Sequence, residues 1–379
     1  MAPLFQKFLR INWLLFFVMV AISIFGIYAI YSATWMRHSD YWSRQLLWIG
    51  VSTVVFFVTS MIDYRWIHWG ALPIYLVALA MLVATYLIGE EQYGAKSWLN
   101  LGFMYFQPSQ LAILSGILVL SWFLSEYRFP PHPTFLGQVG RLFACGCIVA
   151  PPLLLILEQP DLGSTLVWIP MVLGILFVAG IQLRYLICIL LIGAAMVPVV
   201  VNFGLKPYQH DRIMVFLNPD LDPQGAGWTI NQSMIAIGSG GWAGKGFKAQ
   251  NTQNDLGFLP STIVHNDFIF SVIGEQHGFV GGASVVGIFA LLLMICLYIV
   301  FKARDELGRL AGIGITMILF AHVFMNIGMT VAVTPITGLP LPLVSYGGSF
   351  VLIVMFSLGV LQSIWIHRKP LTSTESEYA

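Results

Sequence analysis

The chain is built largely from apolar runs of about 17 to 25 residues, each long enough to cross a bilayer core of about 30 Å as a helix. Because 58% of the residues are hydrophobic and only 9% are charged, a soluble core of this size could not bury the apolar surface. The sequence therefore predicts an all-α integral membrane protein of about ten transmembrane helices. We place them at residues 12–33, 46–62, 70–89, 109–125, 140–157, 164–181, 185–203, 268–301, 309–333 and 345–366.

The run at residues 268–301 is too long for a single crossing. We expect its first third to form an interfacial or re-entrant helix, because backbone can leave the transmembrane direction only where protein or a water-filled cavity surrounds it.

Cysteine usage and net charge argue against several kinds of site. The cysteines all lie in apolar runs, which indicates neither a disulfide framework nor a zinc site. A formal net charge of +1 provides no basic face, so no nucleic-acid partner is predicted. The four cysteines are Cys145, Cys147, Cys188 and Cys296.

Lysine and arginine collect in short cytoplasmic loops, so their distribution predicts the orientation of the helices. If both termini are cytoplasmic, most basic residues fall inside, and the polar stretch at about 202–266 becomes a long ordered extracytoplasmic loop between the seventh and eighth helices. We predict one polytopic domain over 1–369 and a disordered cytoplasmic tail over 370–379. The basic residues left outside are Arg37, Arg44, Lys96, Lys206, Arg212, Lys245 and Lys248.

The long loop carries proline and glycine at a spacing typical of fixed turns. Residues 231–237, which include Gln232, would form an amphipathic turn or two on the membrane surface. The glycine-rich segment 238–246 places Lys245 beside backbone amides that could approach a phosphate. It lacks the Gly-Lys-Ser/Thr ending of a nucleotide P-loop, and a plain flexible loop is the alternative.

Two carboxylates stand between the predicted fifth and sixth helices. Glu158 and Asp161 could steady a cation or a metal-bound pyrophosphate. The alternative, which the spacing alone favours, is that Asp161 caps the helix that opens near Gly163.

One acid stands at the border between the long polar loop and the apolar run that follows it. Asp267 precedes Phe268-Ile269-Phe270, where it is reached from water yet close to lipid. An acid in this position suits an enzyme whose substrate has a polar head and an apolar tail. The alternative is an N-cap for the following helix, which composition alone favours by about two to one.

Several motifs, in the expected order, resemble the SEDS family of polytopic membrane enzymes, and the resemblance covers most of the chain. Residues 326–329 and 335–342 resemble the rod-shape branch of the family more than its division branch, as does the short cytoplasmic N-terminus. The motifs are Gln159-Pro160-Asp161-Leu162-Gly163, Asp222-Pro223-Gln224-Gly225-Ala226-Gly227, Ile235-Ala236-Ile237-Gly238-Ser239-Gly240-Gly241, Asp267-Phe268-Ile269-Phe270 and Leu341-Pro342-Leu343-Val344-Ser345-Tyr346-Gly347-Gly348-Ser349.

The resemblance implies a peptidoglycan glycosyltransferase that polymerises lipid II outside the cytoplasmic membrane during cell elongation. The family's essential aspartate falls on Asp267, and its implied role is general base toward the 4-hydroxyl of the acceptor sugar, with undecaprenyl pyrophosphate as the leaving group. The residues predicted to bind substrate are Arg44, Lys96, Ser97, Trp98, Asp161, Arg212, Gln232, Ser239, Gly240, Gly241, Lys245, Ser345 and Tyr346.

The resemblance also implies a class B penicillin-binding protein as partner, together with lipid II, the growing glycan strand, membrane lipid and other membrane proteins of the elongation complex. A divalent cation, Mg²⁺ or Mn²⁺, would help pyrophosphate depart, but no dense ligand cluster demands it and no metal ligands are predicted. The predicted location is the inner membrane, with the active site outside.

Two rival functions stay open. A lipid II flippase or transporter should carry polar groups to the bilayer midplane and open to both faces, whereas the informative residues here crowd on one face. A scaffold that only recruits the penicillin-binding protein would not need Asp267 for any reaction.

The chain departs from the family pattern at three places. Gln110 and Ile113 stand where relatives commonly carry Glu and Lys, so a buried ion pair is lost as a unit and no single charge is stranded. The approach to the aspartate, residues 259–264, is longer than usual, and Glu275-Gln276 replaces the usual acidic pair.

Overall fold

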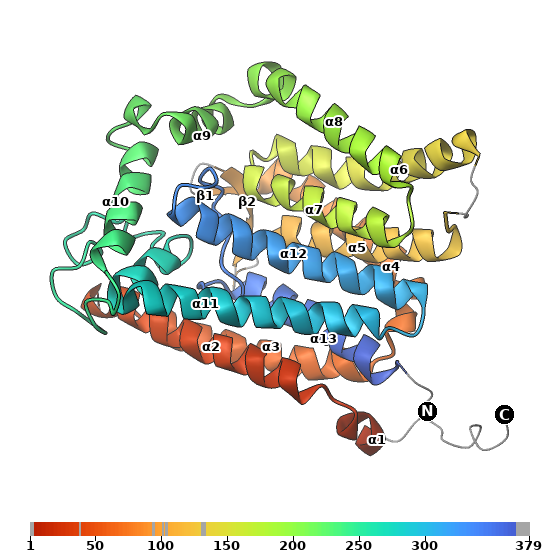
Figure 1. Cartoon of the computed structure of the whole chain (residues 1–379), viewed down its shortest axis with the longest axis horizontal. Helices are drawn as coiled ribbons and strands as arrows, with labels where there is room; N and C mark the ends of the chain where they lie inside the picture. Colours follow the sequence, from red (N-terminus) through yellow and green to blue (C-terminus); the bar gives the residue numbers. More distant parts are fainter. Residues whose placement is uncertain are drawn as a thin grey trace.

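The computed structural model of the chain describes residues 4–37, 39–92, 95–100, 102, 105–129 and 134–368. Most of its helices lie side by side in one bundle, while α1 (Leu4–Leu9) and α9 (Pro207–Leu217) lie apart from it, and this arrangement confirms the all-α membrane class (Figure 1). The predicted tail at 370–379 lies outside the described residues. The α-helices are α1 Leu4–Leu9, α2 Trp13–Thr34, α3 Tyr41–Met61, α4 Ile67–Ile88, α5 Pro108–Glu126, α6 Phe135–Glu158, α7 Leu162–Val178, α8 Leu183–Val199, α9 Pro207–Leu217, α10 Ala226–Ser239, α11 Ile269–Phe301, α12 Glu306–Thr330 and α13 Gly348–Ile366.

The predicted transmembrane runs all correspond to helices. Among the described residues, nine helices are long and apolar enough to cross a membrane, and the shorter α7 is also apolar. The largest differences at a helix start are in α3, which begins at Tyr41 rather than near residue 46, and in α6, which begins at Phe135 rather than near residue 140. The earlier start of α3 places Arg44 in the first turn of a helix rather than in a loop.

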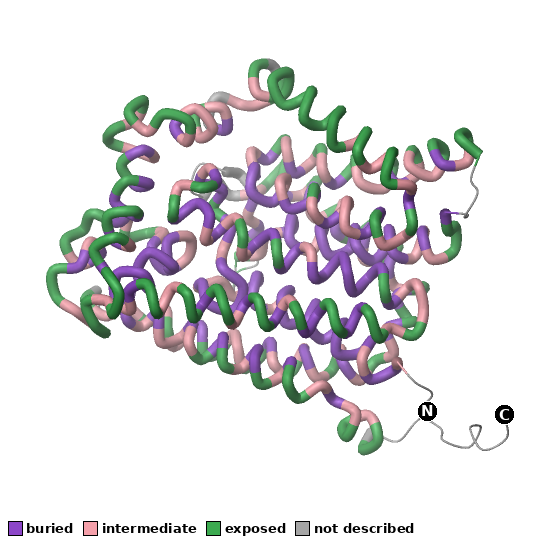
Figure 2. The backbone as a smooth tube through the Cα atoms, viewed as in Figure 1, coloured by how far each residue is buried: buried purple, intermediate pink, exposed green. Residues whose placement is uncertain are grey.

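The centre of the bundle is formed by α5 and α13. Of their most apolar 18-residue windows, 78% and 83% are buried, against 17% in α6 and none in α8. Figure 2 shows α8 as an exposed helix along the edge of the molecule. Hydropathy therefore detects every span, while burial separates the central helices from those that face outward.

A small antiparallel sheet covers one end of the bundle, and the sequence did not predict it. It consists of β1 Glu90–Gln92, β2 Ala95–Asn100 and β3 Tyr105–Phe106, in that order. Leu99 pairs with Phe106, and Asn100 pairs with Tyr105. The sheet fixes the outer hairpin between α4 and α5.

The prediction that the long loop consists of turns is wrong for two of its segments. Pro207 occupies the first turn of α9, and the sequence from Ala226 onward forms α10, a full helix rather than one or two turns. Proline fits the first turn of a helix because its missing N–H would have no partner there. The turn prediction holds between them, where the short 3₁₀ helix η4 Pro219–Leu221 leads to Asp222, whose carboxylate accepts a hydrogen bond from Ala226 N at 2.8 Å.

The long run at 268–301 is divided, as its length predicts. Gly278 interrupts α11 with φ 63° and ψ −160°, so residues 269–277 form a short helical segment separate from the rest. A break of this kind removes backbone hydrogen bonds from the helix, and these groups need other partners if they are buried.

The glycine-rich segment 241–246 supplies those partners. A β-carbon on Gly244 would lie 2.1 Å from the carbonyl oxygen of Gln276, so only glycine allows the two backbones to approach this closely. The hydrogen bonds across this contact are Phe279 N to Gly241 O at 2.7 Å, Val280 N to Trp242 O at 3.2 Å, Lys245 N to Glu275 O at 3.0 Å and Gly246 N to Gln276 O at 2.9 Å.

Candidate functional site

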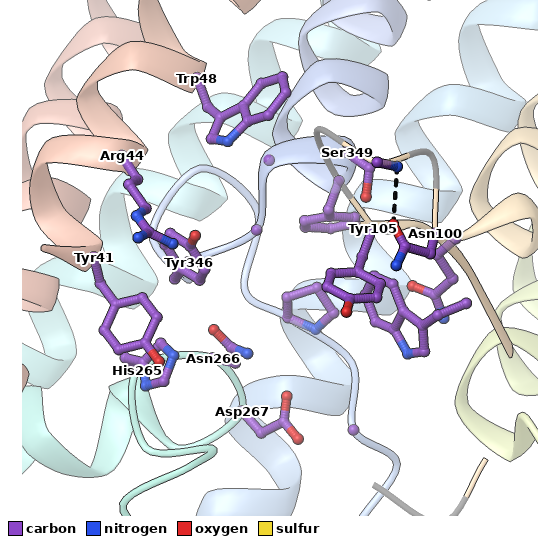
Figure 3. A pocket seen from close by; sticks show the side chains of 18 residues that line it. Tyr41, Arg44, Trp48, Asn100, Tyr105, His265, Asn266, Asp267, Tyr346 and Ser349 are labelled. Carbon is purple, nitrogen blue, oxygen red and sulfur yellow. Dashed lines mark hydrogen bonds between the residues drawn. The ribbon is translucent and has the colours of Figure 1, made fainter. Parts of the chain in front are cut away.

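A cavity of about 520 Å³ opens at one end of the bundle. Its wall comes from the N-terminal parts of α3 and α13, the residues just before α5 and α11, the outer sheet and the segment at 338–347. Figure 3 shows Arg44 and Tyr41 on one side, Asn100 and Tyr105 on the other, and Asp267 on the wall between them. The lining residues are Tyr41, Arg44, Trp48, Trp98, Asn100, Gly102, Tyr105, Gln107, His265, Asn266, Asp267, Gly338, Pro340, Tyr346, Gly347, Gly348, Ser349 and Phe350.

Asp267 is half-buried and lines this cavity. The N-cap of α11 is Phe268, which makes no side-chain cap hydrogen bond, so the interpretation of Asp267 as a helix cap is wrong. Within the part of the chain that the structure describes, no hydrogen bond to the Asp267 carboxylate is formed. The carboxylate is therefore available to a bound molecule.

The backbone that carries Asp267 is held firmly. The Nδ2 group of Asn326, in α12, donates to the carbonyl oxygens of Asp267 at 3.0 Å and Leu339 at 2.7 Å. The hydroxyl of Ser345 donates to the carbonyl oxygen of Asn266 at 2.5 Å. These bonds fix the main chain beside the cavity and do not involve the Asp267 carboxylate.

We expect Asn326→Ala to lower the free energy of unfolding by about 2 kcal/mol, because it leaves two carbonyl groups without their donor. Thermal unfolding of the detergent-solubilised protein measures the effect. Asn202→Ala is the matched control, because its Nδ2 group donates to one exposed carbonyl, that of Pro198. This control should change stability by less than about 0.5 kcal/mol. Equal unfolding temperatures for the two variants would contradict the role given to Asn326.

Burial and one basic side chain set the charge state of Asp267. Loss of solvation raises the pKa of its carboxyl to about 6, and the positive charge of Arg212 partly opposes this shift. A β-carbon on Gly338 would lie 3.6 Å from Oδ2 of Asp267 and 4.0 Å from Nη1 of Arg212, so both groups face the same glycine. Arg212, in α9, also donates to the carbonyl oxygen of Ile336 at 3.1 Å.

An aromatic wall stands beside the acid. The rings of Tyr41 and His265 stack with centroids 4.1 Å apart, and Tyr346 meets Tyr41 edge-on at 4.9 Å. Gln45 holds this wall to α3, because its side chain donates to Ser345 O at 3.1 Å and accepts from Gly347 N at 3.2 Å. Burial raises the pKa of Tyr346, and Arg44 opposes that rise.

The structure brings together four of the residues predicted from the sequence. Arg44, Trp98, Asp267 and Tyr346 all line this cavity, and Ser345 supports its wall without lining it. Arg212 adjoins the cavity at Gly338, as described above. The side chain of Lys96 lies outside the described residues.

Asp161 does not line the cavity. Its Oδ1 accepts from Ser164 N at 2.9 Å, which confirms that it caps α7. Its Oδ2 accepts from the Gln107 side chain at 3.0 Å and from the Ser109 hydroxyl at 3.1 Å. Asp161 is therefore connected to the cavity only through Gln107. The prediction that it contacts substrate is replaced by a structural role, the capping of α7.

The predicted phosphate cradle in segment 238–246 is also corrected. The amides of Lys245 and Gly246 already donate to carbonyl groups of α11. The Lys245 ammonium lies 2.6 Å from the carboxylate of Glu275, and Ser239 contacts the same carboxylate. None of the residues predicted to bind substrate in this segment lines the cavity; they are Ser239, Gly240, Gly241 and Lys245. Ser97 and Gln232 are buried in other parts of the structure and do not line it either.

Sequence reasoning missed several residues of the cavity. Tyr41 and Trp48 lie three residues before and four residues after Arg44 and so share one face of α3. That spacing was a usable signal once α3 was known to begin at Tyr41. Asn100 and Tyr105 reach the cavity through the small sheet, which left no clear pattern in the sequence.

Comparison with known proteins finds relatives that match over nearly the whole chain. The family profile of the FtsW, RodA and SpoVE cell cycle proteins matches residues 8–370. Peptidoglycan glycosyltransferase MrdB of Escherichia coli K12 is 36% identical over 357 residues, which cover 94% of this chain and 94% of MrdB. Peptidoglycan glycosyltransferase RodA of Treponema pallidum is 32% identical and covers 93% of this chain and 97% of its own.

Solved structures agree with this result. A chain from a peptidoglycan synthase complex, studied for its coordination of polymerization and crosslinking, matches with a TM-score of 0.78 at 29% identity, over 94% of this chain and 98% of that one. The rod shape determining protein RodA of Thermus thermophilus matches with a TM-score of 0.68 at 27% identity, over 94% and 97%. The protein is therefore a multi-span membrane protein of the SEDS family, the family of FtsW, RodA and SpoVE.

Proposed function

We propose that this protein is a peptidoglycan glycosyltransferase of the RodA type, which polymerises lipid II into glycan strands during cell elongation. The observation that carries the proposal is the Asp267 carboxylate, which lines a cavity of about 520 Å³ and receives no hydrogen bond from the described residues. The names of the relatives MrdB and RodA support the same activity.

The proposed reaction is a displacement at the anomeric carbon of the donor sugar. Asp267 takes the proton from the 4-hydroxyl of the acceptor sugar as that oxygen bonds to C1 of the donor. The bond from C1 to the pyrophosphate oxygen breaks, and its electron pair leaves with undecaprenyl pyrophosphate. A pKa near 6 keeps Asp267 mostly ionised at neutral pH while leaving it basic enough to accept the proton.

Positive charge on the cavity wall suits the departing pyrophosphate. Arg44 lies in the first turn of α3, and Ser349 lies in the first turn of α13, so both helices present their N-terminal ends to the cavity. Helix N-termini carry partial positive charge and favour anions. The guanidinium of Arg44 and these two ends would stabilise the charge that grows on the leaving group.

We propose a reaction that uses no protein-bound metal at Asp267. Hard cations such as Mg²⁺ bind several oxygen ligands, whereas Asp267 is the one carboxylate among the residues that line the cavity. No three histidine, cysteine or acidic residues cluster as metal ligands in the described ranges.

We further propose that both termini are cytoplasmic, that the cavity faces the outside of the inner membrane, and that a class B penicillin-binding protein crosslinks the product. The bias of lysine and arginine supports the orientation. The structural match to a chain of a peptidoglycan synthase complex, which coordinates polymerization and crosslinking, supports the partner.

The rate should fall as pH decreases through about 6, because the base must be ionised to accept a proton and burial raises the pKa of Asp267 to about 6. An aspartate at its ordinary pKa of 3.8 would keep the rate constant down to about pH 5. Initial rates of glycan synthesis between pH 5 and 8 test this, with binding of labelled lipid II followed at each pH. A flat rate profile would contradict the assignment of Asp267 as the base.

Polymerisation by the purified protein with its penicillin-binding partner in liposomes tests the function. Glycan chains should appear when lipid II is added to the outer side. A flippase would instead move labelled lipid II between leaflets without making polymer. Polymer that depends only on the partner would indicate a scaffold.

A further inference from the structure

Glu275 is a buried acid that the proposed reaction does not use. Its side chain is 1% exposed and pairs with the Lys245 ammonium at 2.6 Å. Its carboxylate also accepts from Gln253 N at 2.9 and 3.1 Å and from the Ser239 hydroxyl at 3.4 Å. A buried charge is tolerated only with such partners, so this cluster ties the end of α10 and the segment 245–253 to α11.

The cluster acts on the short helical segment that begins just after Asp267. Residues 269–277 lie between Asp267 and the break at Gly278, so a continuous helix does not hold them in line with the rest of α11. Figure 1 shows the end of α10 beside this start of α11. The position of the segment is therefore set by the groups that contact its sides.

Glu275 is the only acidic residue in residues 269–277, and its contact is the only ion pair there among the described residues. The remaining side-chain hydrogen bonds are between neutral groups, and each ties the segment to α10 or α2. Ser271 and Ser233 share a hydrogen bond at 2.6 Å, the Ser32 hydroxyl donates to Oε1 of Gln276 at 2.5 Å, and His277 and Tyr28 are joined at 3.1 Å.

We propose that the Lys245–Glu275 pair positions Asp267 for catalysis by fixing residues 269–277 against the glycine-rich segment 241–246. The inference rests on the proposed role of Asp267 as general base. Lys245 and Glu275 are positioning residues, since neither lines the cavity. Their effect is carried by the short segment, whose first residue lies two positions after Asp267.

The test compares Lys245→Met, Glu275→Gln and the double variant in the full-length protein with its partner in liposomes. Lys245→Met leaves the buried carboxylate of Glu275 without its opposite charge, and Glu275→Gln leaves the partly exposed Lys245 ammonium without its anchor. The double variant removes both charges. Small misplacements of a catalytic group cost about 10²-fold in rate. We therefore expect each single variant to lower kcat by about 10²-fold with KM for lipid II unchanged, and the double variant to recover most of that loss.

The control is Lys302→Met, which removes the same type of charge from a residue outside the cavity and outside the cluster. Its kcat should match that of the wild type. Unchanged kcat in both single variants would overturn the proposal, and so would loss of activity that follows only the loss of folded protein. A double variant as slow as the single variants would also overturn it.

A second readout separates this proposal from the proposed function. Asn266→Cys places a thiol on the cavity wall next to Asp267, in a background where the exposed Cys147 and Cys188 are replaced by serine. Its alkylation rate should change in each single variant and return toward the original rate in the double variant. If the wild type makes no polymer, the proposed function fails, and this alkylation pattern still decides whether the pair positions the cavity wall. Alkylation rates that stay equal in all variants would overturn the positioning role.

Discussion

Asp267→Asn is expected to lower the rate of lipid II polymerisation by about 10² to 10⁴-fold, the usual contribution of a general base. The amide keeps the size of the side chain but cannot accept the proton of the acceptor hydroxyl. No described residue hydrogen-bonds the native carboxylate, so the substitution breaks no hydrogen bond of that group and removes only its charge interaction with Arg212. Direct measurement of glycan chains in liposomes, with the partner present, gives the rate.

Folding of the variant provides an internal check. Because the folded state raises the pKa of Asp267, it binds the proton more tightly than the unfolded chain does, and ionisation as pH rises from 3.8 through 6 weakens folding. The Asp267→Asn variant, whose side chain is neutral, should therefore unfold at the same temperature as the wild type or at a higher one. Asp220→Asn, an exposed acid outside the cavity, is the matched control and should retain full activity. Normal polymerisation by Asp267→Asn would remove Asp267 from the mechanism.

Gly278→Ala is expected to lower the free energy of unfolding by about 3 kcal/mol, the second large effect. Its φ of 63° and ψ of −160° belong to a region that almost only glycine adopts. A β-carbon there would lie 2.4 Å from Gly244 N and 2.7 Å from the carbonyl carbon of Trp242. The β-carbon is fixed to the main chain and the atoms that it meets are also main chain, so no change of rotamer relieves the overlap. Segment 241–246 must therefore separate from α11.

Gly287→Ala, in the same helix, is the control for Gly278→Ala. A β-carbon on Gly287 meets nothing within 4 Å, so alanine should be neutral or stabilise the helix by up to about 1 kcal/mol. Thermal unfolding of both variants in detergent, with proteolysis of the long loop as a second probe, makes the comparison. If the two variants unfold at the same temperature, the break at Gly278 does not need glycine.

Hydropathy predicted the helices well because each transmembrane helix must satisfy its own backbone and present an apolar surface. It did not predict which spans are central, because α5 and α8 are both apolar along their length. The helices of the long loop were not predicted at full length for a different reason. Proline and glycine are typical of turns, whereas Pro207 occupies the first turn of α9.

The site was predicted only in part. Asp267 and Arg44 were found, while Tyr41 and Trp48 were not, because the cavity forms where α3 packs against residues about 300 positions later in the chain. Lys245 was assigned to substrate because a glycine-rich pattern with a lysine suggests an anion site. Its partner Glu275 lies 30 residues away, and no local pattern indicates that the two meet.

The pairing of segment 241–246 with the break in α11 has a consequence for how the protein is made. The segment precedes α11 in the chain, so it is synthesised before its partner. Until the two meet, the backbone groups around Gly278 lack their hydrogen bonds, which is costly in lipid. Insertion of α11 to its final depth and folding of segment 241–246 are therefore coupled during biogenesis.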